Sequence, residues 1–89
     1  MLVIVLVMNV QVIFGLMGST HDIIDYVVCC VGAFAKRFMM TNAQAYAYLR
    51  RFKGIDFLLD CYAAEHTLSI DDAVEDILQV CRKHGGRVV

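Results

Sequence analysis

The first strong pattern of apolar and polar positions lies between residues 22 and 38, where apolar side chains recur at intervals of three and four. This spacing places them on one face of an α-helix. Lys36 and Arg37 lie in the last turn, where the helix dipole favours positive charge. The pattern therefore predicts a first helix over 22–38, capped by Ser19. Its predicted core stripe is Ile24, Val27, Val28, Val31, Phe34, Ala35 and Phe38.

Two further helices are predicted between residues 42 and 64. Thr41 and Gln44 form a capping-box pattern for a second helix that extends to residue 52. Gly54 follows, as a residue that can adopt the left-handed conformation of a helix end. The central helix, 55–64, is apolar around so much of its circumference that neighbouring helices are expected to surround it. Its predicted core residues are Ile55, Phe57, Leu58, Leu59, Cys61 and Tyr62.

A fourth helix is predicted to begin after Ser69, which with Asp72 forms another capping pattern. Its first half is acidic and its end is basic, as the helix dipole favours. The predicted buried stripe is Ile70, Ala73, Val74, Ile77, Leu78 and Cys81. Four helices joined by short connections, in a chain without proline, predict an all-α fold. We expect residues 19–89 to form a single helical domain, a compact small bundle of four helices.

Residues 1–18 form an apolar N-terminal segment without a charged residue. A signal peptide would need a basic start and a small-residue cleavage site, and neither is present. A transmembrane helix needs about 20 apolar residues, whereas this run is shorter and contains Asn9 and Gln11. Three interpretations stay open: a mis-called start with translation from Met17, a membrane anchor or export segment, and a strand or helix that covers the core.

Charged residues are nearly balanced, with 8 basic and 9 acidic side chains and a formal net charge of −1. A nucleic-acid-binding domain normally carries a basic excess, so this balance argues against nucleic acid as a partner. Four cysteines are far fewer than a disulfide-rich secreted domain of this size would contain. Because Cys29, Cys61 and Cys81 lie within or beside apolar stripes, we expect reduced, core-facing thiols in a cytoplasmic protein.

Residue types that bind zinc are present, but Cys61, His66, Cys81 and His84 lack the paired spacing of zinc sites. A thiolate nucleophile at Cys61 is also disfavoured, because this residue lies in the most apolar helix. The sequence therefore predicts no metal, no cofactor and no enzymatic activity. Two roles are considered for His66: bonding a helix-end carbonyl beside Thr67, or a contact at the rim of a binding surface.

The second predicted helix carries two tyrosines and two arginines: Tyr46, Tyr48, Arg50 and Arg51. Tyr and Arg are enriched at binding hot spots, so these four residues and nearby His66 form the candidate interaction surface. The helices between 42 and 64 also look like a helix-turn-helix. The second of them, however, carries Asp56 and Asp60 and few donors for base edges. A small DNA-binding regulator is kept as an alternative.

Residues 22–86 resemble a bacterial family known as domain of unknown function (DUF) 3791. The resemblance is carried by DIIDYVVCCVGAFAKRF, by TNAQAYAYLRRFKGIDFLLDCYAAEHTLS and by DDAVEDILQVC with the closing glycines. It covers nearly everything except residues 1–18. Members of this family are often described as encoded beside a second family that looks like an ADP-ribosyltransferase, which implies a toxin–antitoxin-like or accessory pair.

Together, the residues and the resemblance predict a non-catalytic, cytoplasmic protein-interaction module. The expected partner is a protein, and the resemblance points to the ADP-ribosyltransferase-like neighbour. The alternatives are the DNA-binding regulator, an uncharacterised enzyme, and a membrane-anchored small protein if residues 1–18 are a real segment.

Overall fold

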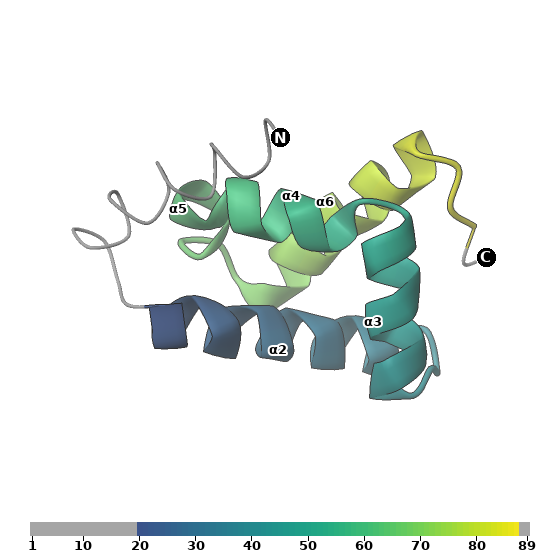
Figure 1. Ribbon diagram of the computed structural model, residues 1–89, viewed down its shortest axis with the longest axis horizontal. Coiled ribbons are helices and arrows are strands. Elements are labelled where there is room, and N and C mark those ends of the chain that lie inside the picture. Colours follow the sequence, from purple (N-terminus) through teal and green to yellow (C-terminus); the bar gives the residue numbers. More distant parts are fainter. Residues whose placement is uncertain (1–19, 88–89) are drawn as a thin grey trace.

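The computed structural model describes residues 20–87, and no strand is found among them (Figure 1). Five helices follow one another along this part of the chain: α2 Thr20–Arg37, α3 Asn42–Arg51, α4 Gly54–Asp60, α5 Tyr62–Glu65 and α6 Ile70–Lys83. The helix α4 contacts α2, α3 and α6, which agrees with the predicted central position. The all-α prediction is confirmed, although the central helix is divided into α4 and α5. Residues 1–18 and the predicted cap at Ser19 lie outside the described residues.

The starts of α3 and α6 follow the predicted capping patterns. The hydroxyl of Thr41 accepts a hydrogen bond from the Gln44 backbone N–H at 3.1 Å, and the Gln44 side chain accepts one from the Thr41 N–H at 2.9 Å. Ser69 caps α6 in the same way, accepting from the Asp72 N–H at 3.1 Å. Each bond satisfies a backbone donor that the first turn of a helix leaves unpaired.

The turn between α3 and α4 differs from the prediction. Lys53, and not Gly54, adopts the left-handed conformation, with φ of 73°. Gly54 is instead the buried first residue of α4. A Cβ atom at Gly54 would lie 2.9 Å from a methyl carbon of Leu49 and 3.1 Å from one of Ile77. Glycine is therefore required here because α4 packs closely against α3 and α6, and not because of its backbone freedom.

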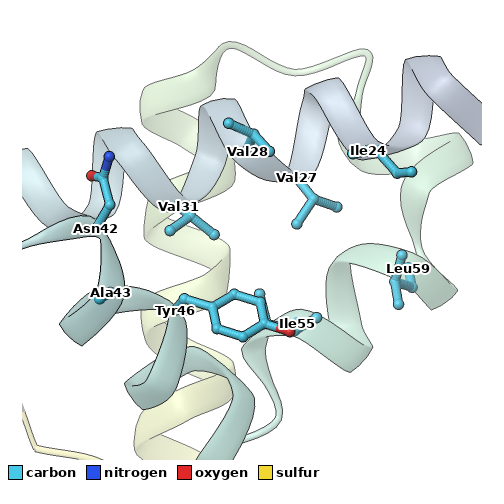
Figure 2. Close-up of a pocket in the computed structure, with 9 residues that line it drawn as sticks. All are labelled: Ile24, Val27, Val28, Val31, Asn42, Ala43, Tyr46, Ile55 and Leu59. Atoms are coloured by element: carbon cyan, nitrogen blue, oxygen red, sulfur yellow. The ribbon is translucent and has the colours of Figure 1, made fainter.

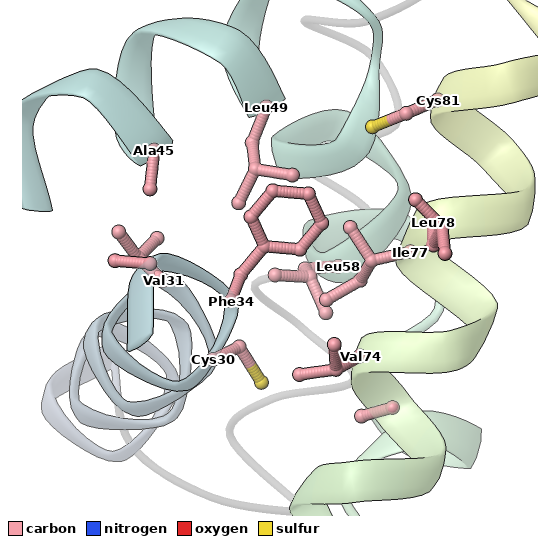
Figure 3. Packing of buried hydrophobic residues seen from close by; sticks show 12 residues of the cluster. Cys30, Val31, Phe34, Ala45, Leu49, Leu58, Val74, Ile77, Leu78 and Cys81 are labelled. Atoms are coloured by element: carbon pink, nitrogen blue, oxygen red, sulfur yellow. The ribbon is translucent and has the colours of Figure 1, made fainter. Parts of the chain in front are cut away.

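The core forms where α2, α3, α4 and α6 meet (Figure 3). Phe34, Leu49, Leu58 and Ile77 are fully buried and come from these four helices in turn. The predicted stripe of α6 is confirmed: all its members are buried except Ile70, which packs against the core from its edge. Burial of these side chains away from water is the main force that holds so short a chain together.

Several residues predicted for the core are exposed instead. Ile24 and Val28 are 56% and 63% exposed, and Leu59 is 37% exposed. Cys29 is also exposed, whereas its neighbour Cys30 is fully buried. The apolar stripe of α2 is wider than the surface that the other helices cover, so its outer edge remains in contact with water. Ile24, Val28 and Leu59 form part of the groove described next.

Candidate functional site

An apolar groove lies between α2, α3 and α4, with a cavity volume of about 570 Å³ (Figure 2). The only polar side chains in its lining are the amide of Asn42 and the phenol of Tyr46. Its lining residues are Ile24, Val27, Val28, Val31, Asn42, Ala43, Tyr46, Ile55 and Leu59. A concave surface of this size lined by aliphatic side chains resembles the sites that proteins use for apolar ligands or partner segments.

Helical spacing explains why three separate elements supply this lining. Ile24, Val28 and Val31 lie on one side of α2, because residues three and four apart share a helix face. The same rule aligns Asn42 with Tyr46 on α3 and Ile55 with Leu59 on α4. Figure 2 shows the Tyr46 ring extending from α3 toward Ile55 of α4, across the groove from the valines of α2. The capping box of α3 fixes the first turn of that helix, which places Asn42 and Ala43 in the groove lining.

The two tyrosines of the candidate interaction surface have different environments. Tyr46 is 44% exposed and lines the groove. Tyr48 is partly buried: its ring stacks on Phe34 with centroids 5.7 Å apart and contacts Phe52 at 4.9 Å. Positions two apart on a helix point in nearly opposite directions. The two rings therefore do not form one surface, and Tyr46 is the one that faces the groove.

The two arginines are both exposed near the end of α3. Arg50 follows Tyr46 by one turn and so lies on the same side of the helix as the groove. Arg51 lies one position further round, where its guanidinium carbon is 5.3 Å from the centroid of the Phe52 ring. Of this pair, Arg50 is the one placed to contact a partner bound in the groove.

His66 has the structural contacts that the sequence suggested. Its Nδ1–H donates to the Tyr62 carbonyl over 2.6 Å, because a carbonyl oxygen can only accept. Its ring stacks on the Tyr62 ring at 4.4 Å, with planes 7° apart. The Thr67 hydroxyl donates to the Ala64 carbonyl at 2.7 Å. These bonds satisfy carbonyls at the end of α5, and they place His66 beside Tyr62 and not on α3.

The cysteines are all free thiols, and Cys30 and Cys81 are buried. Burial disfavours the charged thiolate and so raises the pKa of the Cys30 and Cys61 thiols above the ordinary value. The same effect raises the pKa of Cys81 to about 11. A raised pKa leaves these thiols protonated and weakly nucleophilic at neutral pH. Within residues 20–87, no cluster of three or more His, Cys, Asp or Glu side chains is placed to hold a metal ion.

One carboxyl group is buried in this fold. Glu65, the last residue of α5, is 6% exposed, and Asp76 of α6 is half-buried. Burial, together with the hydrogen bond and negative charge of Asp76, raises the pKa of Glu65 to about 7. Tyr26 of α2 is affected in the same direction, because burial is the main cause of its raised pKa and Cys30 and Glu65 add to it. This cluster was not predicted from the sequence, where Glu65 reads as a loop residue.

A family model described as "Protein of unknown function (DUF3791)" matches residues 25–84. The chain belongs to the DUF3791 family. The matched region extends from α2 to the end of α6 and contains every groove residue except Ile24. The groove is therefore built almost entirely from the part of the chain that defines the family. No curated protein and no solved structure gives a significant match.

The family description names no activity, and none of the described helices is long and apolar enough to cross a membrane. The groove remains the feature of DUF3791 in this chain that most resembles a recognition site.

Proposed function

We propose that this DUF3791 protein is a non-catalytic, cytoplasmic interaction module that binds a protein partner in the groove between α2, α3 and α4. The observation that carries the proposal is the exposure of Ile24, Val28, Tyr46 and Leu59 around one apolar cavity. Exposed apolar side chains that gather on one surface, rather than scatter singly, typically mark interaction sites. The stabilisation gained when a partner covers them is the hydrophobic effect.

The lining also favours a partner segment over a reactive substrate. Asn42 and Tyr46 can orient a bound chain through hydrogen bonds, but the lining contains no carboxylate, imidazole, thiol or amine. The remaining lining residues are aliphatic and offer only packing. Tyr46, with Arg50 on the same side of α3, supplies the residue types that dominate binding energy at protein interfaces.

The helix-turn-helix alternative receives less support from the fold. The helix that would read DNA is α4, which has only seven residues. Its Leu58 is fully buried, and its exposed positions include Asp56 and Asp60. Carboxylates at these positions would repel phosphate, and base recognition needs donors that α4 does not carry.

The partner to test first is the ADP-ribosyltransferase-like protein that the family resemblance implies. The two proteins would be co-expressed, one of them tagged, and their affinity measured by calorimetry for wild type, Val28→Asp and Tyr46→Ala. Because Val28→Asp places a charge on the apolar lining, we expect capture to be lost. Tyr46→Ala should weaken binding about 30-fold, the loss typical of a hot-spot residue. Both variants should keep the wild-type melting temperature, since both side chains are exposed.

Leu68→Asp provides a matched control. Leu68 is 39% exposed, close to the 37% of Leu59, but it lies in the connection between α5 and α6 and does not line the groove. This variant should bind as wild type does. Equal binding by wild type and Val28→Asp would contradict the proposal. Sequence-selective, salt-resistant binding to duplex DNA without capture of the protein partner would favour the regulator instead.

A further inference from the structure

The chain enters the described fold at one end of the groove. Figure 2 shows Ile24 and Leu59 at one end of the groove and Asn42 and Ala43 at the other. Helix α2 begins at Thr20, four residues before Ile24, so its first residue lies about 6 Å from Ile24 along the helix axis. The part of the chain that precedes α2 therefore joins the fold beside the Ile24 end of the groove.

The segment that joins α2 at this end has the same chemical character as the groove. Residues 1–18 contain no charged side chain, and their only polar side chains are Asn9 and Gln11. The groove lining likewise contains no charged side chain, and its two polar groups are an amide and a phenol. Apolar side chains are stabilised when they leave water for such a surface. The few polar groups on the two sides include both donors and acceptors, so they can pair with one another.

The length of the segment also suits the groove. The lining on α2 extends from Ile24 to Val31, which is about 10 Å along the helix axis. Gly15 and Gly18 lie between the more N-terminal apolar residues and α2, and glycine permits the backbone conformations of a sharp reversal. Residues 2–14 would span about 20 Å as a helix and about 40 Å as an extended chain. They are therefore long enough to follow the groove in either form.

We propose that residues 2–14 fold back and occupy the groove of the same molecule, where they cover Ile24, Val28 and Leu59. The tether favours this occupant over a free one, because a short flexible link gives an effective concentration in the millimolar range. Weak apolar packing is then sufficient to hold the segment. The inference deepens the proposed function and rests on it for its consequence: a partner must displace the segment before it binds, which lowers the apparent affinity of the partner.

The direct test is methyl NMR spectroscopy of the full 89-residue chain, with the isoleucine, leucine and valine methyl groups labelled. Nuclear Overhauser contacts are expected between methyl groups of residues 2–13 and those of Val28 and Leu59. A mixed sample of differently labelled chains shows whether these contacts arise within one chain, and they should be absent between chains. Contacts found only between chains would overturn the proposal and assign the groove to a second copy. The absence of any contact would overturn it and leave the groove to the partner alone.

A substitution in the segment provides a second test. Ile13→Asp places a charge among apolar residues and should release the segment, whereas Ile13→Leu should behave as wild type. A soluble paramagnetic probe should then broaden the Val28 and Leu59 methyl signals about twofold more in Ile13→Asp than in wild type, because the covered form no longer dominates. Leu68 is the internal control: it is 39% exposed and lies outside the groove, so its broadening should be unchanged. Equal broadening of the groove methyls in wild type and Ile13→Asp would overturn the proposal.

These measurements use no partner, so they separate this inference from the proposed function. If Val28→Asp abolishes capture but the wild-type groove shows no contact with residues 2–13, the proposed function stands and this inference is wrong. Contacts with the segment, together with unchanged capture by Val28→Asp, would support the segment as occupant and remove the partner from the groove. The methyl signals of Leu58 and Ile77 in the core should keep their wild-type positions in Ile13→Asp, which shows that the variant is folded. If it is not folded, the contacts in the wild-type chain decide the question.

Discussion

Leu58 and Leu59 are neighbours in α4, yet Leu58 is fully buried and Leu59 is 37% exposed. They represent two apolar regions of the molecule: the core where α2, α3, α4 and α6 meet, and the groove between α2, α3 and α4. Both regions are lined by aliphatic and aromatic side chains. The comparison shows that apolar character alone does not place a side chain in the core, because a core also needs a helix to cover it.

The same division runs along α2. Its core side carries Cys30 and Phe34, and its groove side carries Ile24 and Val28. Consecutive helix positions are separated by about 100° around the axis, so a broad apolar stripe includes residues that face different neighbours. The core side of α2 packs against α6. No described helix covers Ile24 and Val28 on the groove side, so they stay exposed in the described fold. We attribute the breadth of the stripe to these two separate requirements.

The largest difference between the two regions is expected from a matched pair of substitutions in α4. Leu58→Ala leaves a cavity among fully buried side chains and should cost about 2–5 kcal/mol of unfolding free energy. Leu59→Ala removes a partly exposed side chain from the groove and should cost about 0.5 kcal/mol. Urea unfolding at one temperature would measure both. Similar losses for the two variants would show that the groove is part of the core.

The sequence was sufficient to predict most of the fold, because helix ends and the α6 stripe depend on local rules. The capping box at Thr41 and the N-cap at Ser69 involve residues three positions apart, and both are present as predicted. The division of the central helix at Cys61 was missed. Nothing in the apolar pattern between residues 55 and 64 marks that position, since Leu58 and Tyr62, the buried residues on either side of it, are four apart, as in one continuous helix.

The candidate site was less predictable, because it depends on which faces of the helices meet. Periodicity placed Ile24, Val28 and Leu59 in the core, since a sequence pattern cannot show where coverage by neighbouring helices stops. The predicted surface on α3 included Tyr46, which lines the groove, and Tyr48, which packs against Phe34. The buried carboxyl of Glu65 was missed for a similar reason: its burial, at 6% exposed, follows from how the helices pack and not from its neighbours in the sequence.

A smaller effect is expected from adding one methyl group inside the core and one at a helix position with open space around it. A Cβ at Gly54 would lie within 3.2 Å of Cys81 Sγ and closer still to Leu49 and Ile77. Gly54→Ala should therefore cost about 1–3 kcal/mol, because the core must shift to accommodate it. At Gly32 in α2 no atom lies within 4 Å of the added Cβ, so Gly32→Ala should stabilise by about 0.5–1 kcal/mol. Opposite signs in thermal unfolding would support this account, and two losses would contradict it.

The smallest expected effect comes from Thr41, whose cap supports the turn of α3 that reaches the groove. Thr41→Ala removes the acceptor for the Gln44 N–H and should cost about 1 kcal/mol. Thr41→Ser keeps the hydroxyl and should stay close to wild type. Hydrogen exchange would locate the loss. Because Asn42, Ala43 and Tyr46 form the α3 side of the groove, their region should exchange faster, while α6 amides around Ile77 should change only by the global loss. Equal acceleration at both places would show that the groove and the core unfold as one unit, and that the two regions differ in exposure but not in local stability.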